Sequence, residues 1–130
     1  MRLSIRCHDG LNEHTDLTIE FLKKFKNNIK SIVEITKSFK PKDYADFAPE
    51  IFRAMDNHDS NAKKIIESEV ILIEQSLMAS GFSEKKAFCL IGGLGKLFLP
   101  YLSDKFINSC KPPKGNALQG AIEIAKREFF

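Results

Sequence analysis

The sequence predicts a single, mainly helical α/β domain, in which five or six helices over residues 1–82 precede a strand–helix–strand–helix tail over residues 83–130. Three observations support this fold class. Apolar residues recur at three- and four-residue steps through most of the first part, as on one face of a helix. A short unbroken apolar run over 87–91 ends in two glycines, which is typical of a buried strand that meets a tight turn. The length of 130 residues suits one domain with one modest core.

The composition is that of a globular protein. Hydrophobic residues make up 43% of the chain and charged residues 28%, far from the balance of a disordered protein. Neither a membrane span nor a signal peptide fits, because the longest unbroken aliphatic run is the short stretch 70–73. We therefore expect a cytoplasmic protein with no membrane partner.

The net charge and the cysteines exclude further classes. A formal charge of +3 from 20 basic and 17 acidic side chains is too small and too evenly mixed to indicate nucleic-acid binding by itself. The three cysteines, Cys7, Cys89 and Cys110, contain no CxxC pair. A reducing compartment therefore suits the chain better than a disulfide framework or a structural zinc site.

The first 28 residues predict two short helices. Arg2 to Cys7 is typical of the end of a helix, which Gly10 stops by adopting a left-handed conformation. A helix that opens at the first residue is expected to have lost its beginning. Thr15 or Asp16 is suited to cap the next helix. Its apolar stripe consists of Leu17, Phe21, Leu22 and Phe25.

The next segments predict three helical pieces. Apolar residues between Ile29 and Ile35 indicate a short helix, which Lys40-Pro41 is expected to end because the residue before proline avoids the helical region. Residues 42–55 hold Pro49 at their centre. A proline fits the first turn of a helix, where a missing N–H costs nothing, so two helical pieces are expected here.

The longest periodic segment follows residue 58. Asp59 or Ser60 is predicted to cap it, and Ser80-Gly81 to end it. Its apolar positions are Ala62, Ile65, Ile66, Val70, Ile73 and Leu77. The additional apolar residues Ile71 and Leu72 predict burial on a second side of this helix.

The tail has a different pattern. Residues 87–91 are predicted to form a buried strand, 94–102 a helix that Pro100 ends or kinks, 106–110 a second short strand and 117–127 a final helix. One or two strands cannot satisfy their own backbone hydrogen bonds, and a parallel sheet needs neighbouring strands. The chain is therefore expected to be part of a larger α/β unit.

The turn between the first predicted strand and the following helix is the main candidate for chemistry. Gly92, Gly93 and Gly95 would let backbone N–H groups approach a phosphate or a nucleotide, with help from the helix N-terminus. Glycines at such turns also have purely steric uses. The loop Lys114-Gly115-Asn116 allows the same two interpretations: ligand contact or structural packing.

Other polar clusters have simpler explanations. Consecutive Cys7, His8 and Asp9 cannot adopt the geometry of a nucleophilic triad. No two of the three histidines have the four-residue spacing that would direct both rings at one metal ion, so no metal site is predicted. The lysines 23, 24, 26 and 30 lie beside Phe21 and Phe25, but those rings fall on the apolar stripe and are expected to be buried rather than to stack on bases.

The ordered set of segments carries a family resemblance over nearly all of the chain. The segments are His8-Asp9-Gly10, His14-Thr15-Asp16-Leu17, Ser31 to Glu34, Pro41 to Tyr44, Phe47 to Phe52, Cys89 to Leu94 and Pro112 to Ala121. Together they resemble the C-terminal part of the BadF-type ATPase and glucosamine/N-acetylglucosamine kinase family, within the actin-like superfamily of sugar kinases. The last two segments are the most specific.

The resemblance implies the C-terminal portion of a ribonuclease-H-like, actin-like ATPase lobe with a helical insertion. It also implies phosphoryl transfer from ATP with magnesium to a hydroxyl of glucosamine or N-acetylglucosamine. Gly92 and Gly93, and less firmly Leu94 and Gly95, are similar to the family's adenosine-side turn. The family's phosphate loop, catalytic aspartate and most sugar contacts have no counterpart here, so no catalytic residue is assigned.

Three hypotheses follow. The first is the adenosine-side portion of an amino-sugar kinase, inactive without an N-terminal lobe, which a truncated gene product, a dissected chain or one half of a split enzyme would explain. A partner chain or a second copy would then complete it, and amino sugar would bind once that lobe is present. The second is a non-catalytic helical protein-interaction module derived from a kinase. The third, nucleic-acid binding through the lysine-rich helix, predicts affinity that falls steeply with salt.

Overall fold

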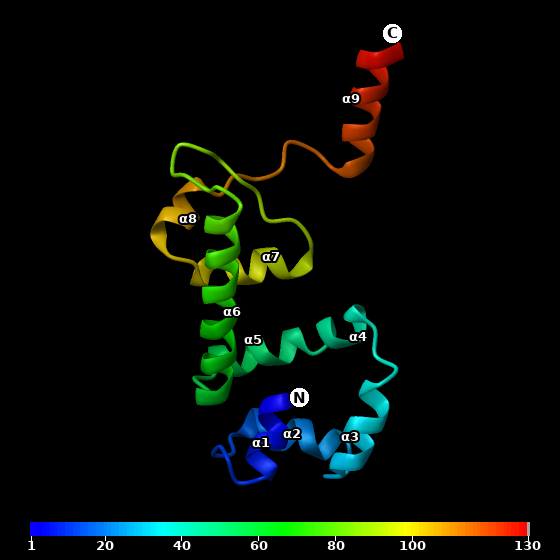
Figure 1. Cartoon of the computed structure of the whole chain (residues 1–130), viewed down its shortest axis with the longest axis vertical. Coiled ribbons are helices and arrows are strands. Elements are labelled where there is room, and N and C mark those ends of the chain that lie inside the picture. Colours follow the sequence, from blue (N-terminus) through cyan, green and yellow to red (C-terminus); the bar gives the residue numbers. More distant parts are fainter. Residues whose placement is uncertain (130) are drawn as a thin grey trace. The chain divides into compact units, whose positions relative to one another are not determined.

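The computed structural model describes residues 1–129 and is mainly helical, as the sequence predicts (Figure 1). The first helices are α1 (Arg2–His8), α2 (Asp16–Lys24), α3 (Ile29–Thr36), α4 (Pro41–Ala45), α5 (Ala48–Asp56) and α6 (Ser60–Ala79). They are followed by α7 (Gly93–Phe98), the 3₁₀ turn η1 (Leu99–Tyr101), α8 (Asp104–Ser109) and α9 (Ala117–Phe129). The chain divides into two compact units, Met1–Ile73 and a second that begins at Glu74. The division falls inside α6, whereas the sequence pattern changes between residues 82 and 83.

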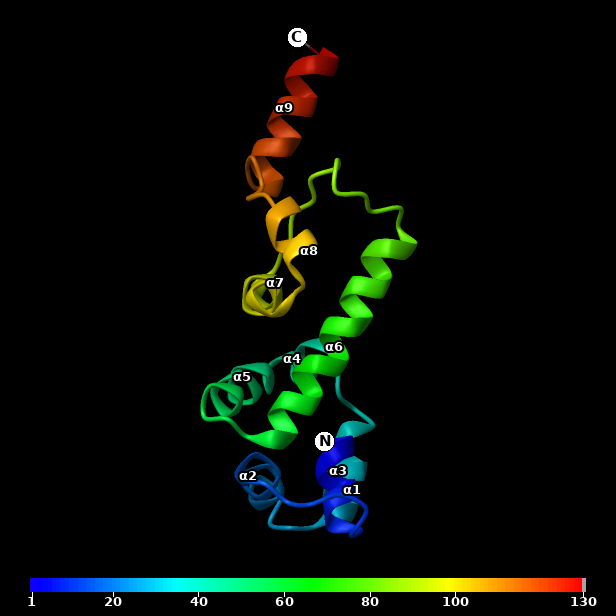
Figure 2. The same ribbon diagram turned by 90° about the vertical axis from the view of Figure 1, so that its left-hand side faces the viewer.

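The core of the first unit lies where α2 meets its neighbours. Phe21 and Leu22 of α2 and Ile32 of α3 are buried together. Partly buried residues pack around them: Met1, Ile5, Phe25, Ile29 and Phe47. Helix α2 contacts both α1 and α5 (Figure 2). This confirms the predicted apolar stripe of α2, with Phe21 buried and Phe25 partly buried, while Lys23 and Lys24 are exposed and Lys24 pairs with Glu50.

One carboxylate fixes the start of two helices in the first unit. Asp59 Oδ1 accepts hydrogen bonds from the backbone N–H groups of Asn61 and Ala62 at the start of α6, at 2.9 and 3.0 Å. Asp59 Oδ2 accepts a third from Leu17 N–H in the first turn of α2, at 3.1 Å. Asp59 therefore caps α6, as predicted, and it also stabilises the start of α2. The N-cap of α2 itself is Thr15.

Of three further predictions for the first unit, the structure confirms one and corrects two. The two helical pieces around Pro49 are confirmed, with Pro49 in the first turn of α5. The third helix was expected to run on to Lys40-Pro41, but α3 ends at Thr36 and Lys40 instead precedes α4 with Pro41 in its first turn. The predicted burial of Ile71 and Leu72 is wrong, because both side chains are about half exposed.

An aromatic cluster forms the core of the second unit. Phe106 of α8 is fully buried, and its ring centroid lies 4.7 Å from that of Phe82 and 6.4 Å from that of Phe88. Leu102, which lies between η1 and α8, is also buried. The start of α8 is fixed by Glu74, whose Oε1 accepts hydrogen bonds from the backbone N–H and the hydroxyl of Ser103 at 2.6 and 2.8 Å.

The predicted strands need correction. Within the described residues, 87–91 forms one isolated parallel bridge, between Phe88 and Cys110, rather than a strand. Residues 106–110 are not a strand either, because most of them belong to helix α8. Two features favour a helix at these residues. Ser103 is the N-cap and Asp104 lies in the first turn, where a carboxylate is favourable. The Phe106 ring also packs against two other rings while its backbone is helical.

The final helices follow the predictions more closely. The helix expected over 94–102 is α7, which passes into η1 with Pro100 in that turn. The final helix, α9, extends away from α7 and α8 in both views (Figures 1 and 2). No residue of α9 up to Phe129 is buried. None of the helices among residues 1–129 combines the length and apolar composition needed to cross a bilayer.

Candidate functional site

A groove in the second unit brings together two segments that the sequence singles out. It has a volume of about 770 Å³, in the range of natural small-molecule sites. The first segment contributes Leu90, Ile91, Gly92, Gly95, Lys96 and Leu99. The second contributes Cys110, Lys111, Pro112, Pro113, Gly115, Asn116, Ala117 and Gln119. These are the predicted glycine turn and the predicted loop before the last helix.

Two glycines shape the first wall of the groove. Gly92 stands as N-cap of α7 with φ +83°, a conformation that costs a residue with a side chain more than it costs glycine. A Cβ atom on Gly95 would lie 2.9 Å from Leu90 Cβ and 3.3 Å from the Leu90 carbonyl carbon. Gly95 thus allows α7 to approach the segment before the turn. Two other members of the predicted set, Gly93 and Leu94, do not line the groove.

The second wall is held by a reciprocal pair of hydrogen bonds at the start of α9. The backbone N–H of Asn116 donates to Gln119 Oε1 at 2.8 Å, and the backbone N–H of Gln119 donates to Asn116 Oδ1 at 2.9 Å. This is the geometry of a capping box, which fixes the direction in which the helix leaves the loop. The side chains of Asn116 and Gln119 are therefore held at the groove wall before any ligand binds.

The charges in the groove favour an anionic ligand with an apolar part. Lys96 and Lys111 are its charged lining residues, and no carboxylate is among them. The backbone N–H of Lys111 is anchored by Phe88 O at 2.8 Å, which keeps the second segment next to the first. Apolar walls with a few fixed polar groups suit a nucleoside, and the lysines suit its phosphates.

Magnesium fits this part of the chain less well than the nucleotide does. Within residues 1–129, no group of three His, Cys, Asp or Glu side chains is arranged to hold a metal ion. Mg²⁺ in kinases is bound by carboxylates together with phosphate oxygens. The described lining of the groove thus contains two lysines and no carboxylate that could bind a metal ion.

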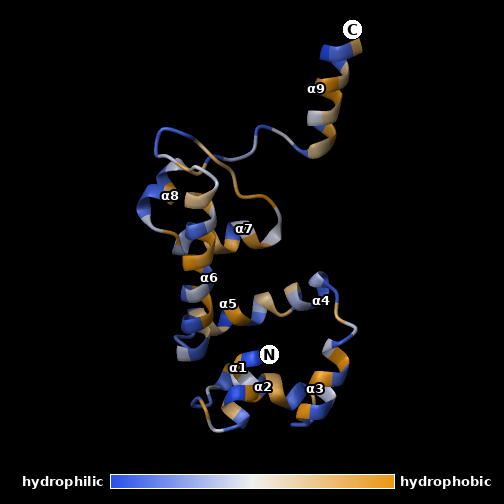
Figure 3. Ribbon diagram, viewed as in Figure 1, coloured by the Kyte–Doolittle hydropathy of each residue, from blue (hydrophilic) through white to orange (hydrophobic). Residues whose placement is uncertain are grey.

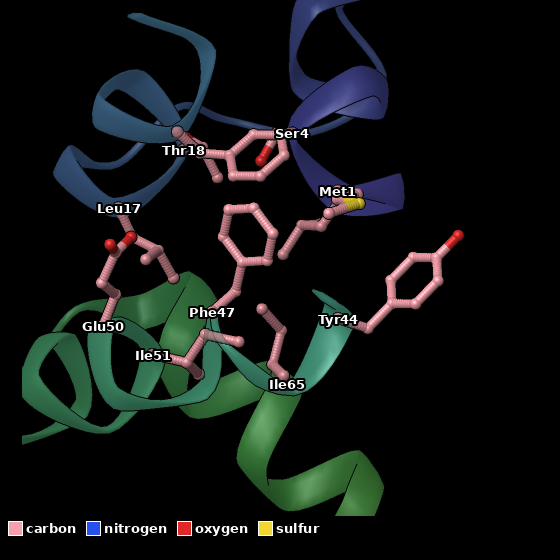
Figure 4. Close-up of a pocket in the computed structure, with 11 residues that line it drawn as sticks. Met1, Ser4, Leu17, Thr18, Tyr44, Phe47, Glu50, Ile51 and Ile65 are labelled. Atoms are coloured by element: carbon pink, nitrogen blue, oxygen red, sulfur yellow. The ribbon is translucent and has the colours of Figure 1, made fainter. Parts of the chain in front are cut away.

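The first unit contains a second cavity, which is small and mostly apolar (Figure 4). Its volume is about 210 Å³, and its lining includes Leu17, Phe21, Phe47, Ile51 and Ile65. Figure 4 shows the Phe47 ring projecting into its centre. The Thr18 hydroxyl at its edge donates to Thr15 O at 2.9 Å and is therefore already satisfied. The lining is mostly apolar, so this cavity is best explained as a gap in the helical core.

A polar groove of about 640 Å³ also lies in the first unit. Its ionisable lining residues are Asp16, Glu20, Lys24, Glu50, Arg53, His58 and Asp59. Lys24 forms an ion pair with Glu50 across it. Burial alone would raise the pKa of Asp59, but hydrogen bonds from the backbone of Ala62, Leu17 and Asn61 and from the Thr15 side chain hold that pKa below its ordinary value.

The sequence analysis did not find this polar groove. Asp16 is about 40 residues from His58 and Asp59, and it comes together with them only through the packing of α2, α5 and α6. Of the other clusters considered, Cys7 is buried in α1 and its Sγ donates to Glu13 O at 3.2 Å, so its contacts are structural. His8 and His14 do not line either groove.

Comparison with known proteins identifies one relative. The chain is 29% identical over 119 residues to the glucosamine kinase GspK of Vibrio cholerae serotype O1. This similarity supports a relationship to a sugar kinase. The match covers 92% of this chain but 40% of the Vibrio kinase, so the chain spans less than half of that protein. No known family profile matches the chain, and no solved structure is detectably similar to it.

Proposed function

We propose that this chain is the adenosine-side portion of an ATP-dependent amino-sugar kinase of the BadF-type, actin-like family. In this proposal the groove of the second unit takes the nucleoside, with Gly92 and Gly95 at its turn. The acceptor is glucosamine or N-acetylglucosamine, phosphorylated at its 6-position. The chain alone is inactive, and a lobe that carries the phosphate loop and the catalytic aspartate completes the site.

One observation carries the proposal: the groove joins residues 90–99 to residues 110–119. These stretches overlap the two segments that most resemble the kinase family, Cys89 to Leu94 and Pro112 to Ala121, and they meet around a space of the size that a nucleoside needs. The lysines at 96 and 111 lie on its walls, where phosphates would be neutralised. The similarity to a glucosamine kinase supports the same assignment.

In this proposal the residues of this chain bind the nucleotide, but they do not catalyse phosphoryl transfer. Phosphoryl transfer depends on positioning the two substrates and on stabilising charge at the transferred group. ATP, when bound with Mg²⁺, supplies the phosphoryl group. The groove residues bind and orient the nucleoside end, the Gly95 contact keeps the turn close to Leu90, and the pair Asn116–Gln119 holds the far wall. A general base for the sugar hydroxyl is assigned to the completing lobe.

Nucleotide binding by the 130-residue chain tests the proposal. Titration calorimetry with ATP and magnesium is expected to show saturable binding with a Kd of about 0.1 to 1 mM, since part of a site gives part of its affinity. Gly95→Ala forces a Cβ against Leu90 and should weaken binding at least tenfold, about 1.4 kcal/mol. Gly120→Ala, whose Cβ meets nothing within 4 Å, is the matched control and should bind as the parent does.

Two results would overturn the proposal. One is the lack of saturable binding by a chain whose circular dichroism shows that it is folded. The other is equal binding by Gly95→Ala and Gly120→Ala. Sugar-dependent release of ADP by the chain alone, measured in a coupled assay with either amino sugar, would contradict its assignment as an inactive portion.

The second candidate, a non-catalytic interaction module derived from a kinase, is favoured by a different observation. Helix α9 exposes Leu118, Ile122 and Phe129 to solvent, with 69%, 46% and 80% of their surfaces accessible. A chain that binds a protein through this helix but never binds nucleotide would fit that candidate. The titration above separates the two.

A further inference from the structure

The segment 87–91 has an apolar face on each side. Phe88 and Leu90 are half-buried and face the second unit, whereas Ala87, Cys89 and Ile91 are exposed. Ile91 has 77% of its surface accessible to solvent. A strand at the surface of an antiparallel sheet alternates apolar with polar residues, but a strand of a parallel sheet is covered on both faces and is apolar throughout. The composition of 87–91 is that of a strand buried on both faces, but one of its faces is exposed to solvent here.

The backbone of the same segment has one free edge. Phe88 N–H donates to Ser109 O at 3.3 Å, and Phe88 O accepts from Lys111 N–H at 2.8 Å, which is a parallel bridge on one side. Neighbouring residues of an extended chain direct their N–H and C=O groups to the opposite side. Within residues 1–129, the backbones of Ala87 and Cys89 make no hydrogen bond to another segment. An edge of this kind recruits a strand.

Helix α9 adds a second uncovered surface in the same unit. Leu118, Ile122, Ala125 and Phe129 follow one another at three- and four-residue steps and form an apolar stripe. Figure 3 shows hydrophobic residues along this helix, and no residue of α9 is buried. Pairs within the helix, such as Lys126 with Glu123, keep the charged side chains off the stripe. An amphipathic helix of this kind packs on a sheet or on another helix.

We propose that segment 87–91 is an edge strand awaiting a parallel partner strand, and that the occupant is the part of a sugar-kinase polypeptide that has no counterpart in this chain. The pairing extends the sheet from the Ala87 and Cys89 edge, and the apolar stripe of α9 then covers the sheet that forms. The choice of occupant rests on the proposed function. The surface itself rests on the exposures and hydrogen bonds above.

The length of the relative supports this occupant over a second copy of the chain. The Vibrio kinase extends well beyond the matched region, which makes up 40% of it, and so has room for further strands. A second copy brings no sheet, because the described residues contain no strand besides the single bridge at Phe88. Two strands make a marginal sheet, and three or more with a covered face are needed for stability.

Co-expression tests the proposal. The full chain is produced together with the portion of the Vibrio kinase that lies outside the match, and complexes are measured by size-exclusion chromatography with light scattering. A complex of one chain with one fragment is expected. In that complex, backbone amides of 87–91 and 117–129 should exchange hydrogen at least about tenfold more slowly than in the chain alone.

Charge substitutions provide the matched comparison. Cys89→Lys and Ile122→Lys together place ammonium groups on the strand face and on the α9 stripe, and neither residue lines the nucleotide groove. This double variant should abolish the complex. Ile71→Lys, an equivalent change at an isoleucine with 55% of its surface exposed, should leave it intact.

The outcomes separate this proposal from the proposed function. A folded chain that binds nucleotide but forms no complex overturns the docking surface alone, whereas a complex without nucleotide binding overturns the function alone. A homodimer of the chain that the double variant breaks makes the second copy the occupant and overturns this choice. If the fragment is insoluble, exchange in the chain alone still decides, because slow exchange at Ala87 and Cys89 would mean that the edge is not free.

Discussion

The two units of this chain differ in how much of their structure they satisfy for themselves. In the first unit, the Asn61 side-chain amide donates to Glu13 O and to Thr15 Oγ1 and Asp59 caps two helices, although Asn61 Oδ1 is buried without a partner. In the second unit, Phe106 and Leu102 form a small core, and every residue from Lys111 to Ile124 is exposed. The first unit resembles a finished helical domain, and the second resembles part of one.

This difference reflects the two ways in which helices and strands satisfy their backbone groups. Helices satisfy their backbone hydrogen bonds internally, so a helical unit needs only the packing of its own helices against one another. A strand relies on other strands, and the described part of the second unit holds one isolated bridge, between Phe88 and Cys110. The following predictions test whether the two units depend on separate interactions.

The largest effect is expected at the core of the second unit. Phe106→Ala removes a fully buried ring that contacts Phe82 and Phe88, which should cost about 3 to 5 kcal/mol and unfold that unit while the first unit remains folded. Residue-resolved hydrogen exchange would measure this. Phe129→Ala removes the same group where 80% of it is exposed, and should change stability by less than about 0.5 kcal/mol. Equal loss in both units after Phe106→Ala would contradict separate cores.

The reverse experiment acts on the first unit. Asp59→Ala removes the acceptor for Leu17, Asn61 and Ala62, so the starts of α2 and α6 lose a cap and the unit should lose about 2 kcal/mol. Urea unfolding followed by circular dichroism measures the change. Asp46→Ala removes an exposed carboxylate paired with Lys42 and should cost at most about 0.5 kcal/mol. A similar effect of both substitutions would show that the caps do not hold the unit.

The pH dependence of the first unit follows from the same carboxylate. Hydrogen bonds overcome the effect of burial and lower the pKa of Asp59 below its ordinary value of 3.8. The stability that this gives is fully present above pH 3.8 and is lost as the pH falls through the lowered pKa. Urea midpoints for the parent should therefore fall more steeply below pH 4 than those of Asp59→Asn. Parallel pH profiles of the two proteins would exclude Asp59 as the source.

The smallest loss of stability is expected at Tyr44, on the surface of the first unit. The Tyr44 hydroxyl donates to Thr36 O at 3.3 Å, and 47% of the residue is exposed. Tyr44→Phe should cost less than about 0.5 kcal/mol, because water replaces a long exposed hydrogen bond. Tyr44→Ala should cost more, since the ring packs edge-on against Phe39 at 5.3 Å. Thermal melts of both variants compare the hydroxyl with the ring.

The sequence predicted features that depend on neighbouring residues and missed those that depend on distant ones. The caps at Thr15 and Asp59 and the position of Pro49 follow from local chemistry, and all three were found. The strand predicted at 87–91 is reduced to one bridge, between Phe88 and Cys110, because strand formation depends on partners that no local pattern specifies. Ile71 shows the same limit: an apolar side chain indicates a partner surface, but the sequence alone does not say whether that surface is present.

The candidate site divides in the same way. The glycine turn is a local signal, so Gly92 and Gly95 were identified from the sequence. The polar groove was missed because α2, α5 and α6 contribute to it from positions about 40 residues apart, a separation that no local pattern encodes. Gly93 and Leu94 share the turn but do not line the groove, since the lining positions 92, 95, 96 and 99 follow the three- and four-residue steps of one face of α7.

The bond between Asp59 and Leu17 spans 42 residues and links two helix starts through one side chain. Opening either helix start would therefore uncap the other, so the two are expected to open as one cooperative step rather than to fray separately. The link adds a long-range contact to the local cap at Thr15, because the Leu17 N–H gains its partner only after the chain up to residue 59 has been made. During synthesis, the start of α2 would then be completed late.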